Sequence, residues 1–297
     1  MRGGAAELHA GLFDLRHTVE SAQPVTFFGD YDHGVRNITY AAGSHAISIS
    51  RHGNDADCTL RIGSGDLALA RRDVARRFRL SDDMPRIYNA INHDGVLTEP
   101  IRRYRGMRLT LNDPWETTVC FIVSQFNNVP RIRGIVRRIV ERYGTAIEGQ
   151  GGAVVARSFP TSEDLAEVTV KEFMECGAGF RARYLKEAAA YCSENLDLGR
   201  LSPRKYEKLK EALMGITGVG SKVADCIALM GYGSMEAFPV DVWVKRTVER
   251  LYFNGREKSI SEIHSFARER FGRHAGYAQQ YIFWSGRQMD REFRAVV

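Results

Sequence analysis

The stretch from Leu213 to Met230 constrains the fold more than any other part of this 297-residue chain. It reads LMGITGVGSKVADCIALM, in which two apolar segments flank the turn Gly218-Val219-Gly220. Glycine can adopt positive φ and lets a backbone approach a ligand without interference from a Cβ atom. The pattern predicts a helix that ends near Leu213, a tight turn, and a second helix that begins at about Ser221.

Exposed backbone N–H groups at such a turn form a site for phosphate. Contacts of this kind position a protein on nucleic acid without reading its sequence. The chain carries 42 Lys and Arg against 36 Asp and Glu, a net charge of +6, which suits a polyanionic partner. The alternative is that the turn only connects two helices, which is the usual meaning of an isolated Gly-x-Gly motif.

Lys222 falls in the first turn of the second helix, which is otherwise apolar. The helix dipole disfavours a cation at this end, and partial burial acts in the same direction. We therefore expect a lowered pKa for Lys222, as a nucleophilic lysine requires. Cys226 lies one turn further on the same face, where it is either a polar neighbour of the lysine or a small core residue.

Asp241 occupies the centre of the segment FPVDVWVKR, where Pro239 fixes the approach of the chain. We expect Asp241 to be the N-cap of a helix that runs to about Tyr252. A capping carboxylate that also faces a cleft can stabilise positive charge developing on a sugar ring. A lysine nucleophile together with this carboxylate predicts cleavage of an N-glycosidic bond.

The rest of the chain divides into a strand-rich and a helical part. Residues 25–63 contain short β-branched and aromatic segments separated by Gly, Asn and Asp, which is typical of an antiparallel sheet. The later patterns predict helices over 69–93, over 131–143 with a cap at Gly144, from Ser202-Pro203 to about Leu213, and from a Ser259/Glu262 capping box to near Gly272. We expect an α+β protein with an N-terminal antiparallel sheet domain (1–110) and a larger all-helical domain (111–297). The last helices would be able to pack back on the first domain.

Composition excludes several classes of protein. The five cysteines are dispersed, which argues against a disulfide framework, and no His, Cys and Asp residues have the spacing of zinc ligands. The N-terminal segment lacks the apolar core of a secretory signal, and no apolar run approaches the ~20 residues of a membrane span. We expect an intracellular protein of the cytoplasm or nucleoid, or of the nucleus in a eukaryote. We expect neither a metal nor a cofactor, and leave open a structural cation at the hairpin.

The motifs together resemble those of the helix-hairpin-helix, Gly/Pro-Asp superfamily of DNA glycosylases, and within it the 8-oxoguanine DNA glycosylase/AP lyase family. The signature is GVGSKVADC followed by PVDV. Several motifs in one order make the resemblance specific. It extends over most of the chain, through Phe13–Leu15, Asn112–Pro114, Gly179–Tyr184 and Gly276–Gln279. The resemblance implies a monomeric base-excision repair enzyme that acts on duplex DNA carrying a damaged base.

The resemblance also implies the chemistry. Lys222 would attack the sugar C1′, displace the damaged base and form a Schiff base with the assistance of Asp241, and β-elimination would then nick the strand. The damaged nucleotide would first be flipped out of the duplex into a pocket. By their match to the family, Cys226, Gln279 and Phe283 would line that pocket.

Other matched positions would contact the DNA that remains in the duplex. The hairpin glycines Gly218 and Gly220 would hold its backbone, and Arg131 and Arg181 would read the cytosine left behind. Without the family match, both arginines would be interpreted as surface charges on helices.

Three positions depart from the family pattern. A run of three asparagines appears here as Phe126-Asn127-Asn128, so an aromatic ring at Phe126, with Asn127 beside it on the DNA, would fill the vacated stack. Phe can stack but cannot hydrogen-bond the orphan base, which predicts looser discrimination of the opposite base. Ala22 aligns with the family glycine whose carbonyl senses the lesion. Trp243 stands where the family often has a His near a phosphate, and its indole N–H can donate instead.

Two alternatives remain open. The same chemistry could act on alkylated or other damaged purines, because the fold does not determine the pocket, and the substitution at Ala22 favours keeping this open. The chain could also be a non-catalytic helix-hairpin-helix DNA-binding protein. The joint presence of Lys222 and Asp241 speaks against the latter, since a hairpin that only grips phosphates needs neither.

Overall fold

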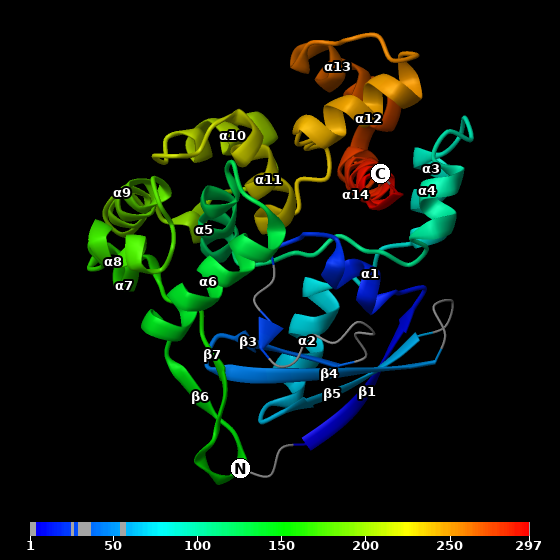
Figure 1. The fold of residues 1–297 in the computed structure, drawn as a ribbon. Helices are drawn as coiled ribbons and strands as arrows, with labels where there is room; N and C mark the ends of the chain where they lie inside the picture. Colours follow the sequence, from blue (N-terminus) through cyan, green and yellow to red (C-terminus); the bar gives the residue numbers. More distant parts are fainter. Residues whose placement is uncertain (1–3, 25–26, 29–36, 54–57, 297) are drawn as a thin grey trace.

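An antiparallel sheet lies beside a larger helical body in the computed structural model, which describes residues 4–24, 27–28, 37–53 and 58–296 (Figure 1). The predicted α+β class is confirmed. The described strands are β1 (Gly4–Gly11), β2 (Phe27–Phe28), β3 (Asn37–Ala42), β4 (His45–Gly53), β5 (Cys58–Ser64), β6 (Ala146–Glu148) and β7 (Val154–Arg157). The described α-helices are α1 (Leu15–Glu20), α2 (Leu67–Arg77), α3 (Met84–Ile91), α4 (Thr98–Arg103), α5 (Pro114–Ser124), α6 (Val129–Tyr143), α7 (Ser162–Ala166), α8 (Val170–Glu175), α9 (Arg181–Glu194), α10 (Tyr206–Met214), α11 (Ser221–Tyr232), α12 (Val242–Tyr252), α13 (Ile260–Phe271) and α14 (Ala275–Val296).

The sheet has the strand order β1-β5-β4-β3-β2, and each neighbouring pair is antiparallel. Alternate residues of β5 are buried, as expected for a sheet with one face on a core. α2 covers that face, and its Val74 packs in one cluster with Leu60 and Ile62 of β5. The antiparallel sheet predicted from the short segments within residues 25–63 is confirmed by β3, β4 and most of β5, while Val25 and Thr26, which belong to the first of those segments, lie outside the described residues.

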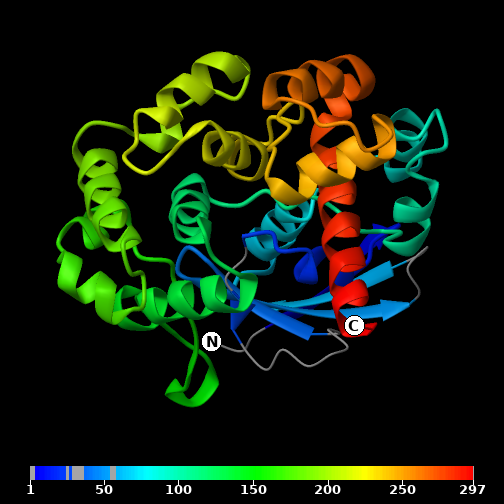
Figure 2. The ribbon, with the colours of Figure 1, turned by 45° about the horizontal axis from the view of Figure 1, so that its top comes forward.

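A second and larger core holds the helical body together. It contains α5 and α11, whose Val119, Val123 and Ile227 are buried, and it extends from Met84 to Trp284. Figure 2 shows α5 lying inside the ring of the other helices and α14 running down toward the sheet. The division at residue 110 stays a prediction. None of the described helices combines the length and the apolar character needed to cross a membrane.

Buried polar contacts join the two parts. Arg77 of α2 donates to Asn112 Oδ1 at 3.0 Å, directly before α5. Tyr277 of α14 donates from its hydroxyl to Asp82 Oδ2 at 2.7 Å. Gln280, also on α14, donates to the Ser21 carbonyl at 2.9 Å. The long C-terminal helix therefore bonds directly to residues that follow α1 and α2.

Two helices begin or end at other residues in the structure than the sequence predicts. The helix expected over 69–93 is two helices, α2 and α3, because Arg79 adopts φ 49° and Pro85, which has no N–H, lies in the first turn of a new helix capped by Asp83. The helix expected from Ser202-Pro203 begins at Tyr206. Ser202 Oγ accepts from the N–H of Arg204 at 3.3 Å, and such a local bond closes a turn instead of opening a helix.

Two other helix ends are confirmed. Ser259 and Glu262 form a reciprocal capping box at the start of α13. α6 ends before Gly144, but that residue has φ −77°, so the glycine does not supply a left-handed cap. A Cβ atom there would lie 2.3 Å from the Ser158 carbonyl oxygen, and close approach of the chain is what requires glycine.

Candidate active site

The helical hairpin forms where the sequence predicts it. α10 ends at Met214 and α11 begins at Ser221. Gly218 adopts φ 84°, whereas Gly220 has φ −86°, so only the first glycine supplies a left-handed conformation. No side chain caps the start of α11. The N–H groups of its first turn are therefore not taken by a capping side chain, as an anion site at a helix N-terminus requires.

Lys222 lies in the first turn of α11 with a half-buried side chain. It hydrogen-bonds with Cys226 and interacts electrostatically with Asp241. Its Nζ atom lies 5.3 Å from the centre of the Phe121 ring of α5. The structure thus brings together the predicted nucleophile, its carboxylate partner and the cysteine one turn away.

The pKa of Lys222 differs from the prediction. Burial lowers the pKa of Lys222, whereas Cys226 and Asp241 raise it, and the result lies above the ordinary lysine pKa. The lowered pKa inferred from the helix dipole is wrong for the protein without DNA, because that inference left out the acidic groups around the amine. Burial raises the pKa of Cys226 to about 11, which makes it a neutral thiol at pH 7.

Asp241 is the N-cap of α12, as predicted. Its Oδ1 atom accepts from the N–H groups of Trp243 at 2.9 Å and Val244 at 2.8 Å. These bonds fix the carboxylate at the start of the helix while it also acts on Lys222. Capping and proximity to the lysine are therefore compatible.

Gln279 and Phe283 lie one turn apart on α14. Gln279 is buried and donates from Nε2 to the Pro239 carbonyl at 3.2 Å, two residues before Asp241. Its Oε1 atom is buried with no hydrogen-bond partner among the described residues. A buried acceptor in this position is suited to receive a hydrogen bond from a bound molecule. The Phe283 side chain is half-buried and contacts the helical core.

Ala22 adopts φ 62°, the left-handed conformation that glycine tolerates best. Its neighbours are anchored: the Ser21 carbonyl accepts from Gln280 of α14, and Gln23 Nε2 donates to the Arg108 carbonyl at 2.9 Å. Ala22 is therefore held in a glycine-like conformation beside the helix that carries Gln279.

The turn between α5 and α6 presents Phe126, which is 94% exposed and has φ 47°. Asn127 in this turn donates from Nδ2 to the Val123 carbonyl at 3.1 Å. Arg181 is buried, and it donates to the carbonyl oxygens of Gln125 and Phe126. In the protein without DNA, Arg181 therefore supports the turn and is not directed at a base.

Arg131 is exposed near Arg181. Burial and the charge of Arg131 together lower the pKa of Arg181. Trp243 is half-buried at the start of α12, with the Arg246 guanidinium 6.0 Å from its ring. The two predicted arginines are thus brought together, next to the exposed Phe126.

Four residues near these sites were not predicted as functional. Phe121 looks like core in the apolar segment of α5, and nothing in the sequence marks Gln125. Phe180 and Tyr184 belong to the motif GFRARY, in which only Arg181 was given a role. The exposure of Phe180 (54%) appears only in the structure.

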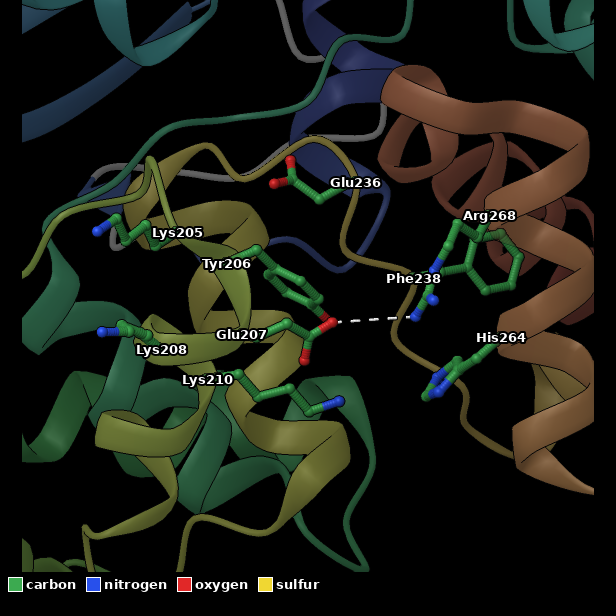
Figure 3. Close-up of a pocket in the computed structure, with 9 residues that line it drawn as sticks. All are labelled: Lys205, Tyr206, Glu207, Lys208, Lys210, Glu236, Phe238, His264 and Arg268. Carbon is green, nitrogen blue, oxygen red and sulfur yellow. Dashed lines mark ion pairs between the residues drawn. The ribbon is translucent and has the colours of Figure 1, made fainter.

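A separate hollow lies between α10 and α13 (Figure 3), and its volume is about 610 Å³. The side chains that line it are Lys205, Tyr206, Glu207, Lys208, Lys210, Glu236, Phe238, His264 and Arg268. Tyr206 and Lys210 bind Oδ1 of the fully buried Asp225 of α11, at 2.6 and 2.7 Å. His264 Nε2 lies 3.7 Å from Oδ2 of the same carboxylate. The cluster joins α10, α11 and α13, and neither Lys222 nor Asp241 lines this hollow.

Residues 119–273 match the HhH-GPD superfamily of base excision DNA repair proteins. The match spans more than half of the chain and includes the hairpin, Lys222 and Asp241. The chain belongs to this family.

Relatives in this family carry glycosylase names. A probable N-glycosylase/DNA lyase of Methanothermobacter thermautotrophicus is 31% identical over 72% of this chain and 73% of its own length. The structure of MBOgg1 in complex with a low-affinity DNA ligand has a TM-score of 0.86, with 33% identity over 98% of this chain and all of that chain. An 8-oxoguanine glycosylase/lyase of Clostridium acetobutylicum, bound to duplex DNA with cytosine opposite 8-oxoguanine, has a TM-score of 0.84 and 30% identity, over 94% of this chain and 93% of that chain. The family fold thus covers nearly the whole chain.

Proposed function

We propose that this chain is a bifunctional DNA N-glycosylase and AP lyase that removes 8-oxoguanine from duplex DNA. The observation that carries the proposal is the half-buried Lys222 at the start of the second hairpin helix, bonded to Cys226 and acted on by the Asp241 carboxylate. The glycosylase/lyase names of the relatives support the same activity. The purely DNA-binding alternative does not explain why a lysine and a carboxylate meet beside the hairpin.

In the proposed reaction the Lys222 amine attacks C1′ of the flipped nucleotide. The bond from C1′ to the base breaks, and the base leaves with the electron pair and takes up a proton. Asp241 stabilises the positive charge that develops on the sugar. Because the pKa of Lys222 lies above its ordinary value in the protein without DNA, the ammonium must transfer a proton before it attacks. The C1′–O4′ bond of the sugar then breaks, with its electron pair going to O4′, which takes up a proton, and a Schiff base forms between C1′ and the Lys222 nitrogen. Loss of a C2′ proton from this Schiff base expels the 3′ phosphate by β-elimination.

The proposed base pocket is formed by Cys226, Gln279, Phe283 and Ala22. The unpartnered Oε1 of Gln279 is suited to accept from an N–H on the edge of a flipped purine. 8-Oxoguanine carries an N–H at N7 that guanine lacks, and a backbone carbonyl is a suitable acceptor for it. The left-handed conformation of Ala22 supports the proposal that its carbonyl takes this role.

We assign the remaining DNA contacts to the hairpin and its surroundings. Gly218, Gly220 and Trp243 would hold phosphates, and Phe126 with Asn127 would enter the gap left by the flipped base. Arg131 would read the orphan base. Arg181 would join it after releasing the carbonyl oxygens of Gln125 and Phe126, to which it donates in the protein without DNA. We further propose that the protein acts as a monomer wherever the cell keeps its DNA, in the nucleoid or the nucleus.

Borohydride trapping tests this function. Duplex DNA with one 8-oxoguanine opposite cytosine is incubated with the protein and borohydride, beside a Lys222→Gln variant. We expect a covalent complex and a nicked strand with the native chain and neither with the variant, since only an amine forms a reducible Schiff base.

The other outcomes are distinct. Trapping on an abasic site without trapping on 8-oxoguanine would retain the lyase and point to alkylated or other damaged purines. The absence of trapping on both would leave the DNA-binding alternative. Undiminished trapping in Lys222→Gln would assign the Schiff base to another amine.

We also predict loose discrimination of the opposite base. Phe126 fills space by stacking and offers no side-chain hydrogen bond to the orphan base. Single-turnover excision rates with cytosine or adenine opposite the lesion should therefore differ by about tenfold or less, whereas a site that reads a base by a good bidentate pair gains ~1–3 kcal/mol of discrimination. A strong preference for cytosine would contradict the prediction and show that Arg131 and Arg181 discriminate the opposite base without a hydrogen bond from residue 126.

A further inference from the structure

The turn that carries Phe126 is in a conformation that must be imposed on it. A phenylalanine with φ 47° clashes with its own backbone. Its ring is almost fully exposed, so core packing does not stabilise this conformation. Strained residues of this kind persist only where the surrounding structure determines their conformation. The neighbours of the turn therefore decide where the ring stands.

One set of contacts comes from α9. Arg181 donates from Nε to the Gln125 carbonyl at 2.6 Å, from Nη2 to the same oxygen and to the Phe126 carbonyl at 2.9 Å, and from Nη1 to the Ala178 carbonyl at 3.3 Å. A planar guanidinium that engages consecutive carbonyls restricts their orientation. The backbone on both sides of Phe126 is held in this way.

A second contact comes from the hairpin. Gln125 donates from Nε2 to the Gly218 carbonyl at 2.9 Å and to the Ile122 carbonyl at 3.2 Å. Gly218 is the residue with φ 84° at the centre of the hairpin turn. The residue that precedes Phe126 is thus bonded directly to the turn that would grip the DNA backbone.

Aromatic side chains complete the connection. The Phe126 and Phe180 rings are 6.4 Å apart, and the Phe180 and Tyr184 rings are 6.1 Å apart. Gly218 lies so close to Tyr184 that an added Cβ would be 2.8 Å from the tyrosine Cβ. The contacts therefore form a closed circuit of neighbouring residues, which runs from Phe126 through Phe180, Tyr184, Gly218 and Gln125 back to Phe126.

We propose that Gln125 is a positioning residue that couples the hairpin to Phe126. Binding of the DNA backbone at the hairpin fixes the Gly218 carbonyl, and Gln125 transmits this position to the next residue, so that the ring stands at the gap when the nucleotide leaves the stack. The inference rests on the proposed function in one respect: Phe126 is taken as the residue that fills the gap. Gln125 itself contacts neither the lysine nor the base pocket in this assignment.

The test replaces Gln125 by Met, which has a similar length and no amide donor. 2-Aminopurine next to a tetrahydrofuran abasic analogue reports, by its fluorescence, whether a ring enters the gap. We expect Gln125→Met to reduce the fluorescence change and to slow single-turnover excision of 8-oxoguanine by about tenfold, the effect of losing one well-formed hydrogen bond. Affinity for undamaged duplex should stay within about twofold, because the hairpin N–H groups are unchanged.

A neighbouring serine provides the matched control. Ser124 donates from Oγ to the Phe121 carbonyl at 2.8 Å, within its own helix. Ser124→Ala should therefore behave like the native chain. In a Phe126→Ala background, Gln125→Met should have no further effect, because Gln125 acts through the ring.

Two results would overturn the proposal. One is a native fluorescence change in Gln125→Met, and the other is an undiminished effect of Gln125→Met in the Phe126→Ala background. If Gln125→Met fails to fold, Gln125→Glu serves instead, since its carboxylate would face the Gly218 carbonyl and should disturb the ring at least as strongly. The fluorescence experiment uses an abasic duplex, in which no base has to be excised. It therefore still measures the coupling if the chain does not remove 8-oxoguanine, a result that would refute the proposed substrate alone.

Discussion

At the scale of single residues, backbone strain coincides with the expected DNA-facing positions. Only four described residues other than glycine have positive φ, namely Ala22, Arg79, Phe126 and Asn254. Two of these, Ala22 and Phe126, are positions that the resemblance to the family places in the lesion pocket and at the gap in the duplex. A strained conformation has to be held by its surroundings, and both residues are flanked by neighbours whose carbonyls or side chains are anchored.

The strain at Ala22 gives a prediction of stability. In Ala22→Gly the left-handed conformation is no longer costly, but the unfolded chain becomes more flexible. We expect the free energy of unfolding to rise by up to about 1 kcal/mol, as measured by urea denaturation. Excision activity should be retained, because the carbonyl stays in place.

An alanine in an ordinary helix is the control. Ala190 lies in the interior of α9, where glycine costs about 1 kcal/mol. Ala190→Gly should therefore destabilise the protein while Ala22→Gly does not. Equal losses of stability in both variants would show that Ala22 is not strained.

The sequence predicts which residues are reactive better than it predicts their protonation. Lys222, Cys226 and Asp241 follow from local patterns, because each has a fixed place on a helix or at its cap. The pKa of Lys222 could not be predicted in the same way, since it depends on Asp241, which lies 19 positions away in the chain. Gln125 carries no sequence signal, because its partner, Gly218, becomes a neighbour only through folding.

At the scale of elements, helix ends were predicted where the signal lies in adjacent residues. The capping box of α13 and the Asp241 cap of α12 are such cases. The prediction failed where a local signal had two meanings. Ser202-Pro203 can open a helix or close a turn, and here Ser202 Oγ accepts from the N–H of Arg204, which closes the turn. The contact between two helices is harder still to predict, because it depends on which residues face each other.

The crossing of α12 and α14 is such a contact. A Cβ atom at Gly286 of α14 would lie 2.0 Å from Oγ1 and 3.1 Å from Cβ of the buried Thr247 of α12. We expect Gly286→Ala to lower the free energy of unfolding by roughly 1–3 kcal/mol, as overpacked cores do. Urea denaturation measures the loss.

A double-mutant cycle separates this clash from other effects of the substitution. Thr247→Ala removes Oγ1 and leaves the 3.1 Å contact, which small shifts can relieve. In that background Gly286→Ala should cost little or stabilise the protein, because alanine favours a helix interior by about 1 kcal/mol over glycine. Additive losses of stability would contradict the proposed clash.

At the scale of the whole molecule, both hydrophobic cores contain buried tyrosines whose hydroxyl groups hydrogen-bond between different elements of the fold. Tyr281 hydrogen-bonds with Tyr88, and Tyr277 donates to Asp82. Tyr40 of the sheet donates to Asp73 of α2 at 2.8 Å. Such networks bind donors and acceptors from distant parts of the chain, so neither composition nor periodicity could predict them. They make the stability of the whole fold depend on pH.

Burial raises the pKa of Tyr40, Tyr277 and Tyr281 above 10. Below pH 10 these phenols are protonated in both the folded and the unfolded chain. As the pH rises above 10, the unfolded chain loses their protons while the folded chain keeps them. The free energy of unfolding should therefore fall by up to about 1.4 kcal/mol per pH unit for each tyrosine. Urea denaturation between pH 8.5 and pH 11, values chosen to span roughly the ordinary tyrosine pKa, measures the slope.

Tyr277→Phe isolates one of these contributions. The variant loses the hydrogen bond to Asp82, but that carboxylate keeps its bond from Arg79 at 2.7 Å. Its stability at pH 8.5 should drop by about 1.5–3 kcal/mol, the usual contribution of a hydrogen bond to a charged group. Its alkaline slope should be shallower than that of the native chain, because one phenol fewer is protected. If the two slopes coincide, Tyr277 ionises as readily in the folded chain as in the unfolded one, and its contact with Asp82 is open to water.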